Sequence, residues 1–374
     1  MLILRNFIVE RFKGVPWGIL LNTYLLLLIG LYNLYSATNA VDSPDRFYYQ
    51  LSVMCFGTFL IFFWGILLDI KTIERLALFG YIVVCVMLVT VDVFGSHAKG
   101  AERWLVVGPL RIQPSEFAKF MTILIVAYSF SHMKYISDFT LFSLWRQILF
   151  VGFPFLLILV QPDLGTAGLV LLIACIQIST VKVNWKSIAI VGAIGVTLAL
   201  LAWNFVLYDY QKQRILTFIN PMLDPRGAGY HSIQSMIAVG SGGVWGQGFG
   251  QGTQARLNFL PERHTDFIFS VWAEEHGFIG CLGVIFLFCT LILQIFQVAE
   301  RAKDIFSSLV AIGVGAFFMM HFLINVSMVL GVFPVVGVPL SLISYGGSHL
   351  ITAMSCIGLL IAIDRKRAHS LHIV

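Results

Sequence analysis

Ionisable side chains gather in one stretch of an otherwise apolar sequence. The run NFLPERHTDFIFSVWAEEHG, residues 258–277, holds Arg263, His264 and Asp266 just before a long apolar segment. An ionisable residue at the edge of a membrane-spanning segment is a functional hypothesis by default. A carboxylate at Asp266 could serve as a general base or as a ligand for a divalent cation. The alternative is a solvated aspartate at the start of a helix.

The local sequence predicts how Asp266 is held. Thr265 is a candidate N-cap, which places Asp266 in the first helical turn, where the helix dipole and a nearby arginine favour its anionic form. Helical spacing then puts one small and polar stripe on the same face: Asp266, Ser270, Ala273 and Gly277. An ordinary aspartate is a weak base for a sugar hydroxyl, so proton transfer would come late or need a raised pKa.

A second group of charges follows Pro114. In QPSEFAK, Glu116 and Lys119 are three residues apart on a predicted helix and close enough to pair. A self-satisfied structural ion pair is the simpler interpretation. The alternative is a binding role, because four cations surround the same loop: Lys99, Arg103, Arg111 and Lys119. Such cations would suit a pyrophosphate, since they oppose the charge that grows on a departing phosphate.

Three further motifs carry weaker signals. Asp163 in QPDLG has the place of a turn-forming aspartate. The run GSGGVWGQGFGQG lacks the ending and the preceding strand of a phosphate-binding loop, so we interpret it as a flexible turn. His264 and Asp266 form an H-x-D pair, which is too short a pattern for a metal centre. His321 and His349, in or beside apolar segments, receive no predicted role.

The composition sets the class of protein. Of 374 residues, 58% are hydrophobic and 11% are charged, and the mean hydropathy is +0.88. These values exceed the apolar share of soluble domains and indicate an integral membrane protein. Several apolar runs reach the roughly 20 residues that a helix needs to cross a bilayer. We therefore predict an all-α polytopic protein with spans at 17–36, 48–68, 76–94, 115–131, 147–161, 165–181, 187–207, 267–298, 307–330 and 349–363.

Charge distribution orients these ten spans. An even number puts both termini on one side, and most lysines and arginines outside the spans fall on that side, which the positive-inside rule makes cytoplasmic. The whole chain, 1–374, is expected to form one membrane domain, with a large extracytoplasmic loop at 208–266. Helices are predicted within that loop at 209–219 and 230–241. Its cations, among them Arg214 and Arg263, run against the topological bias and suggest an anionic ligand.

Five segments taken together resemble one family. They are KGAERWLVVGPLRIQPSEFAK, QPDLGTA, DYQKQRILTFINPMLDPRGAGYHSIQSMIAVGSGG, FLPERHTDFIFSVWAEEHGFIG and FPVVGVPLSLISYGGSHLI. In this order they resemble the shape, elongation, division and sporulation (SEDS) family over nearly the whole chain, and the LPERHTDFIF block is highly specific. The DYQKQR and DPRGAGYHSIQS segments are more similar to its rod-shape members than to its division members.

The resemblance implies a ten-span peptidoglycan glycosyltransferase of the bacterial cytoplasmic membrane that polymerises lipid II on the outer face. The family's catalytic aspartate matches Asp266, its fourth-span Glu and Lys match Glu116 and Lys119, and its QPDLG aspartate matches Asp163. It also implies a class B penicillin-binding transpeptidase as partner, with MreC and MreD as neighbours in the elongation complex. Nucleic acid is not expected as a partner, and membrane lipid is.

These observations combine into one expectation with two alternatives. A groove between Asp266 and residues 99–119 would hold two lipid-linked sugars, with Arg214, Arg263 and His264 also contacting substrate. A divalent cation, Mg²⁺ or Mn²⁺, could sit at Asp266, and no organic cofactor is expected. One alternative is a flippase for the lipid-linked precursor, whose polar path should continue across the membrane. The other is a non-catalytic scaffold that activates a transpeptidase.

Overall fold

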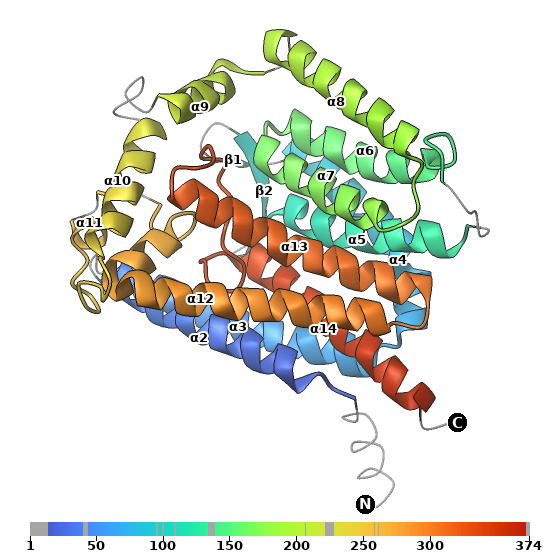
Figure 1. The fold of residues 1–374 in the computed structure, drawn as a ribbon, viewed down its shortest axis with the longest axis horizontal. Coiled ribbons are helices and arrows are strands. Elements are labelled where there is room, and N and C mark those ends of the chain that lie inside the picture. The colour runs from blue at the N-terminus through green and yellow to red at the C-terminus, as the bar shows by residue number, and fades with distance from the viewer. Residues whose placement is uncertain are drawn as a thin grey trace, which may run out of the picture.

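Ten long helices dominate the chain. The computed structural model describes residues 14–39, 44–94, 96–98, 101–107, 110–133, 139–205, 207–220, 228–257, 259–260 and 262–371. The helices are α2 (Trp17–Asn39), α3 (Pro44–Phe62) with a π-helical turn η1 (Phe63–Leu67), α4 (Ile70–Phe94), α5 (Pro114–Ser131), α6 (Trp145–Val160), α7 (Leu164–Ser179), α8 (Trp185–Phe205), α12 (Ile268–Arg301), α13 (Ile305–Val329) and α14 (Gly347–Leu371). A helix therefore lies at each predicted span (Figure 1).

Within the described residues, seven of these helices are long and apolar enough to cross a membrane, and α6 and α7 are shorter apolar helices. The chain is thus an all-helical, multi-span membrane protein. Two predicted starts were wrong: α3 begins at residue 44 rather than 48, and α4 at 70 rather than 76. Both first turns carry charges, Arg46 in α3 and Lys71 in α4, so an apolarity criterion cut them off.

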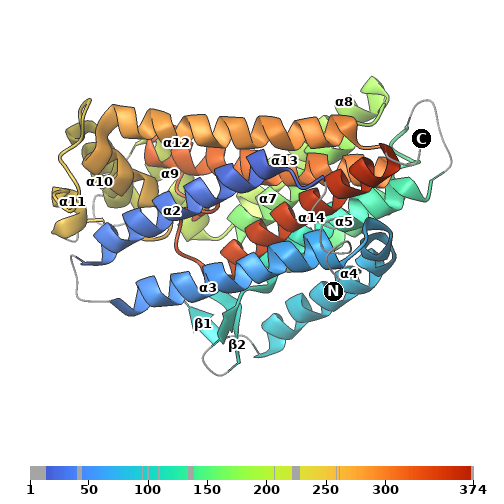
Figure 2. The same cartoon turned by 90° about the horizontal axis from the view of Figure 1, so that it is seen from below.

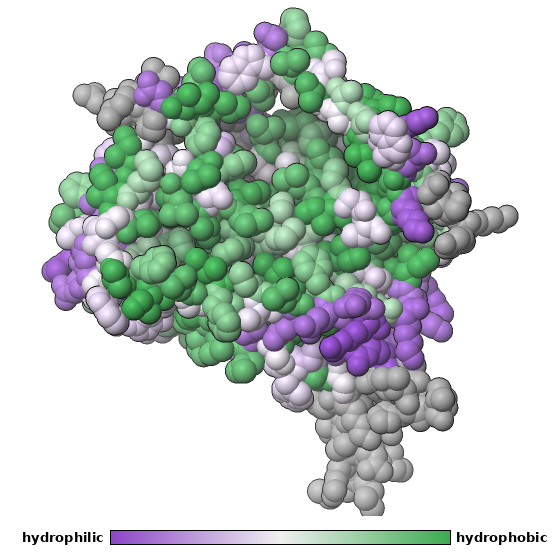
Figure 3. Space-filling model, in the orientation of Figure 1, coloured by the Kyte–Doolittle hydropathy of each residue, from purple (hydrophilic) through white to green (hydrophobic). Residues whose placement is uncertain are grey.

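The helices pack around α13 and α14. Contacts join α12 to α13 and α2, α14 to α3, and α13 to α5 and α7 (Figures 1 and 2). Leucine, isoleucine, phenylalanine and alanine fill this interior. Figure 3 shows apolar side chains over the helix faces as well, with hydrophilic ones gathered near the C-terminal end and around the opposite end of the bundle. Such a surface suits a hydrocarbon surrounding. Helix α8 stands apart from the bundle and is exposed over most of its length.

A small antiparallel sheet was not predicted. Strands β1 (Ser96–Ala98), β2 (Ala101–Val107) and β3 (Leu110–Ile112) lie in order in the connection between α4 and α5. Residues Leu105 and Ile112 pair across β2 and β3. The run RWLVV followed by GP and LRI has the β-branched and aromatic character of a hairpin, so the sequence carried this signal. The sheet brings the chain into the first turn of α5.

The described part of the long connection between α8 and α12 holds three helices, α9 (Asp209–Ile219), α10 (Ala228–Ser241) and α11 (Thr253–Arg256). The two helices predicted within this loop are thereby confirmed. Helix α10 packs on α12 and α13, and its Ser235 hydroxyl lies 2.8 Å from that of Ser270 on α12 and donates to the carbonyl of Val329. The loop is therefore built onto the ends of the membrane helices.

The glycine-rich run after α10 is not the flexible turn that its sequence suggested. Helix α12 is broken at Gly277, whose φ of 64° is left-handed. The break frees backbone groups on both sides of it, and the glycine-rich run pairs with them. Two loop amides donate to carbonyls of α12 and two α12 amides donate to loop carbonyls: Gln247 to Glu274, Gly248 to Glu275, Phe278 to Gly243 and Ile279 to Val244, at 2.9–3.2 Å.

This backbone pairing explains the glycines. A β-carbon on Gly242 would overlap the carbonyl oxygen of Ala273, and one on Gly246 would overlap that of Glu275. Gly246 also has a φ of 83°, which disfavours any residue with a β-carbon. The run and the outer half of α12 therefore form one unit, the glycine clamp (residues 242–248 with Gly277). It fixes the direction in which the start of α12 points.

We expect Gly246→Ala to lower the free energy of unfolding by about 2 kcal/mol or more, because overpacking and a left-handed alanine both cost stability. Thermal unfolding of the purified protein in detergent measures this change. Gly240→Ala is the matched control, since a β-carbon at Gly240 meets nothing within 4 Å and alanine favours a helix. Equal melting of Gly246→Ala and the wild-type protein would contradict the clamp.

Candidate active site

Asp266 lies just before α12 and not in its first turn. Residues 262–267 form turns, α12 begins at Ile268, and its N-cap residue Phe267 makes no side-chain cap. The predicted N-cap role of Thr265 is therefore wrong: its hydroxyl instead donates to Glu262 Oε2 at 3.2 Å. Asp266 also cannot share a helical stripe with Ser270. The polar residues 262–266 thus lie outside the helix that their apolar neighbours form.

Three consecutive carbonyls fix the Asp266 segment (residues 264–266). The His264 carbonyl accepts from the Tyr345 amide at 2.9 Å, and the Thr265 carbonyl accepts from the Ser344 hydroxyl at 2.7 Å. Asn325 of α13 donates to the carbonyl of Asp266 at 2.8 Å. Because the backbone is bound at three successive positions, the direction of the half-buried Asp266 side chain is set by the fold.

The residues after α13 form the wall opposite Asp266. A β-carbon on Gly337 would lie 3.5 Å from the Asp266 carboxylate oxygen Oδ2, and Gly337 has a φ of 74°. The same Asn325 amide that holds Asp266 also donates to the carbonyl of Val338 at 2.7 Å. Glycine thus serves both the backbone conformation and the space beside the carboxylate.

A group of cations lies near this segment. Arg46, in the first turn of α3, has a guanidinium nitrogen 3.4 Å from the ring nitrogens of His264. The His264 ring lies 5.7 Å from the ring of Tyr345. Arg263 is buried and donates to the carbonyl of Ala37 at 2.9 Å. Burial and the charge of Arg46 lower the pKa of Arg263.

Arg111 belongs to the same group. Burial and the Tyr49 hydroxyl raise the pKa of Tyr345, whereas the charges of Arg46 and Arg111 oppose this shift, so both arginines lie within electrostatic reach of Tyr345. The charge of Arg46 acts unfavourably on that of Arg263, and guanidinium groups placed near one another suit a multiply charged anion. We call Arg46, Arg111 and Arg263 the arginine group.

Arg46 was not among the predicted site residues. It lies outside every predicted span, in the connection between the first and second, and this connection was predicted to be extracytoplasmic. It is therefore another cation against the topological bias, the same signal that identified Arg263. Of the other predicted cations, Lys99 lies outside the described residues, and Arg103 is described only by its backbone, on β2.

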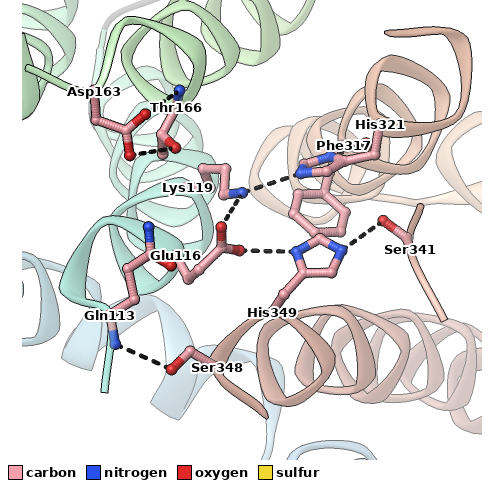
Figure 4. A network of polar contacts seen from close by, with 10 residues as sticks. All are labelled: Gln113, Glu116, Lys119, Asp163, Thr166, Phe317, His321, Ser341, Ser348 and His349. Atoms are coloured by element: carbon pink, nitrogen blue, oxygen red, sulfur yellow. Dashed lines mark hydrogen bonds and ion pairs between the residues drawn. The ribbon is translucent and has the colours of Figure 1, made fainter. Parts of the chain in front are cut away.

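Glu116 and Lys119 form the predicted ion pair, at 2.8 Å and deeply buried (Figure 4). The Lys119 ammonium also lies 3.0 Å from Nε2 of His321 on α13, and the second Glu116 oxygen lies 2.8 Å from Nδ1 of His349 on α14. The Lys119 side chain has no exposed surface. Direct contact with a phosphate would require this network to open, so the binding role of Lys119 stays a prediction.

The partners assign the protons of this network. Nδ1 of His321 lies 2.8 Å from the carbonyl of Phe317, so it donates there, and Nε2 accepts from Lys119. Nδ1 of His349 faces the Glu116 carboxylate and donates to it. With both imidazoles neutral, one ammonium balances one carboxylate, as a buried cluster requires.

Asp163, which was predicted to form a turn, is the N-cap residue of α7. Its carboxylate accepts from the backbone amide of Thr166 at 3.3 Å and from the Thr166 hydroxyl at 2.9 Å, at the start of α7. The residue also lines a cavity of about 250 Å³ between α7, α9, α13 and residues 333–338. Its walls are mainly apolar, and Arg214 of α9 joins them from an exposed position.

This cavity adjoins the Asp266 segment, because Val336 and Val338 of its wall flank Gly337. It differs from the groove predicted against residues 99–119, part of which lies outside the described residues. The difference arises because the segment after α13 folds back between the helices, which the apolar sequence FPVVGVPL did not indicate. An apolar wall with a cation suits a lipid-linked anion.

Among the described residues, no group of three or more His, Cys, Asp or Glu side chains is placed to hold a metal ion. Asp266 offers one carboxylate. Mg²⁺ and similar cations are commonly held by one or two carboxylates together with substrate phosphates and water. The side chains present therefore suit a cation shared with a phosphorylated substrate rather than one held by protein ligands alone.

Comparisons with known proteins identify the family of the chain. Residues 16–369 match the family described as "Cell cycle protein", which groups FtsW, RodA and SpoVE. The chain is 41% identical to peptidoglycan glycosyltransferase MrdB of Escherichia coli (strain K12) over 297 residues, 79% of this chain and 80% of that protein.

Solved structures agree as well. One, from work on polymerization and crosslinking by a peptidoglycan synthase complex, matches with a TM-score of 0.82 and 28% identity over 95% of this chain and 99% of that one. The rod shape determining protein RodA of Thermus thermophilus matches with a TM-score of 0.72 and 27% identity over 95% of this chain and 98% of that one. The chain therefore belongs to the SEDS family of FtsW, RodA and SpoVE, as its motifs predicted.

Proposed function

We propose that this protein is a peptidoglycan glycosyltransferase that polymerises lipid II during cell elongation. The similarity to MrdB supports the class of reaction. The single observation that carries the mechanism is the placement of Asp266, which three backbone hydrogen bonds hold near the arginine group. A fixed carboxylate beside a cationic site is what glycosyl transfer from a pyrophosphate requires: a base for the acceptor and charge stabilisation for the leaving group.

The ten long helices are ten membrane spans of the bacterial cytoplasmic membrane. Both termini lie on the cytoplasmic side, where Arg301 ends α12, Lys303 follows it, and Lys366 and Arg367 lie near the end of α14. The active face is extracytoplasmic. In Figure 2, α10 and α11 lie at one end of the bundle and the C-terminus lies at the other, in keeping with this arrangement.

In the reaction, Asp266 accepts the proton of the acceptor's 4-hydroxyl group. The acceptor oxygen attacks the donor's anomeric carbon with inversion, forming the glycosidic bond as the bond from that carbon to the pyrophosphate oxygen breaks. Because an aspartate is a weak base, the proton moves late, when the attacking oxygen has become acidic. The arginine group binds the undecaprenyl pyrophosphate that departs.

The apolar cavity beside Gly337 holds the part of a polyprenyl chain nearest its pyrophosphate, and Arg214 faces that charge. His264 lies beside the arginine group and Asp163 lines the apolar cavity, so both contact the substrate at its periphery. A bound Mg²⁺ or Mn²⁺ would neutralise the pyrophosphate, with Asp266 as its protein ligand. No organic cofactor has a role in this reaction.

A class B penicillin-binding transpeptidase acts beside this protein and crosslinks the strands, and MreC and MreD belong to the same assembly. The similarity to a chain of a peptidoglycan synthase complex that coordinates polymerization and crosslinking supports such a partner. The transport alternative needs a polar path to the cytoplasmic side. Below His349, α14 instead buries Ile357, Leu359, Leu360 and Ile361, which argues against such a path.

Asp266→Asn should abolish lipid II polymerisation by the purified full-length protein, because the amide cannot accept the proton. Glycan length on gels, with and without the transpeptidase and divalent cations, measures it. Asp304→Asn is the matched control, since asparagine caps α13 as well as aspartate does. Chain formation near the wild-type level by Asp266→Asn would exclude Asp266 as base and as metal ligand and would favour the scaffold alternative.

Arg46→Gln should lower kcat/KM for lipid II by about 10- to 100-fold, since one charge-assisted hydrogen bond contributes about 1.5–3 kcal/mol. Initial rates across lipid II concentrations measure the effect. Arg301→Gln, the same change at the cytoplasmic end of α12, should leave the rates unchanged. Equal kcat/KM values for Arg46→Gln and Arg301→Gln would remove Arg46 from the pyrophosphate site.

A further inference from the structure

We infer that Ser341 and His349 are positioning residues, which hold the Asp266 segment in its reactive place without contacting substrate. The inference rests on the proposed function, because it acts through Asp266. Neither residue had a predicted role. The structural basis is a tight turn at residues 340–344, which lies between the Asp266 segment and the buried network of Glu116 and Lys119.

The turn holds an unfavourable conformation. Leu342 has a φ of 68°, in the left-handed region that residues with a β-carbon rarely adopt. The Ser344 amide donates to the carbonyl of Leu340 at 2.9 Å, and the Leu340 amide donates to the Ser344 hydroxyl oxygen at 2.8 Å. Strained backbone of this kind persists where the surrounding structure determines it and is concentrated at functional sites.

Hydrogen bonds join the turn to the Asp266 segment. The Ser344 hydroxyl that closes the turn also donates to the carbonyl of Thr265, and the next amide, of Tyr345, donates to the carbonyl of His264. On the other side of the turn, Asn325 joins the carbonyls of Val338 and Asp266. A displacement of the turn therefore displaces the backbone that carries the Asp266 carboxylate.

Ser341 fastens this turn to the membrane interior. Its hydroxyl lies 3.1 Å from Nε2 of His349, and both side chains are buried (Figure 4). Since Nδ1 of His349 donates to Glu116, Nε2 is the acceptor and the Ser341 hydroxyl is the donor. Glu116 is held in turn by Lys119. The link thus passes from α14 to α5 through His349 and ends in the closed Glu116–Lys119 ion pair within α5.

Helix α2 closes the turn from another side. A β-carbon on Gly30 would lie 2.7 Å from Cα of Ile343 and 2.8 Å from the carbonyl oxygen of Leu342. The backbone of α2 therefore presses directly on the strained residues, and the link from Ser341 to His349 holds the same turn through a side chain. Contacts to other elements fix the turn at several points, as a strained segment needs if it is to keep one position.

Steady-state kinetics of lipid II polymerisation by the full-length protein tests the inference. Ser341→Ala and His349→Asn should each lower kcat by about 10- to 100-fold with KM unchanged, because a small misplacement of a catalytic group has an effect of this size. The double variant should be no slower than the slower single one, because both changes cut one link.

A pair of substitutions at His349 separates positioning from general packing. Asparagine can donate to Glu116 from the place of Nδ1 but has no group at Nε2, whereas glutamine reaches the place of Nε2 and can accept from Ser341. His349→Gln should therefore retain a higher kcat than His349→Asn. Ser355→Ala, which removes another buried hydroxyl from α14, should keep the wild-type kcat.

Three results would overturn the inference: wild-type kcat in Ser341→Ala, equal kcat in the asparagine and glutamine variants, or losses that multiply in the double variant. Melting temperatures separate misfolding from misplacement, and Ser341→Ala, which removes one oxygen, carries the test if His349→Asn does not fold. Asp266→Asn is assayed in parallel. If it is inactive while Ser341→Ala is fully active, only the positioning role fails, whereas activity in Asp266→Asn defeats the proposed mechanism itself.

Discussion

The structure depends on keeping an ammonium group charged inside an apolar bundle. Lys119 has no exposed surface, and an unpaired cation there would be very costly. Glu116 supplies the balancing charge, His321 accepts from the ammonium group, and His349 donates to the carboxylate. These four side chains come from α5, α13 and α14, so satisfying one charge fixes three helices in register. The segment between α13 and α14 packs against this network through the hydrogen bond between Ser341 and His349.

The site contains two kinds of polar group. The arginine group and Asp266 lie in or beside the connections between helices, where the proposed function places the substrate. The network around Lys119 lies within the helices and is closed. In the proposed function, the residues of the connections bind the charged substrate and carry out the reaction, and the buried network supports them. The segment between α13 and α14 joins the Asp266 segment to the network around Lys119. It lacks regular secondary structure, yet its residues 340–344 are buried.

Much of this could be predicted from the sequence. The length of the apolar runs located every long helix, and the spacing of Glu116 and Lys119 predicted their ion pair. The QPDLG motif predicted a turn at Asp163, which caps the start of α7. What sequence could not supply was contact between distant segments. His349 meets Glu116 across 233 residues, and Gly337 meets Asp266 only because the chain turns back after α13. The glycine-rich run was misjudged for the same reason, since glycine signals both flexibility and close approach.

The glycine clamp has a consequence for biogenesis. Residues 242–248 leave the ribosome before α12, and the groups that they must meet follow about thirty residues later. Contacts between segments this close in sequence form quickly, with little loss of chain entropy. The glycine-rich run can thus pair with the broken helix as soon as that helix has formed. Because the glycine-rich run is synthesised before α12, correct assembly of the loop is favoured over a trapped intermediate in which α12 is only half inserted.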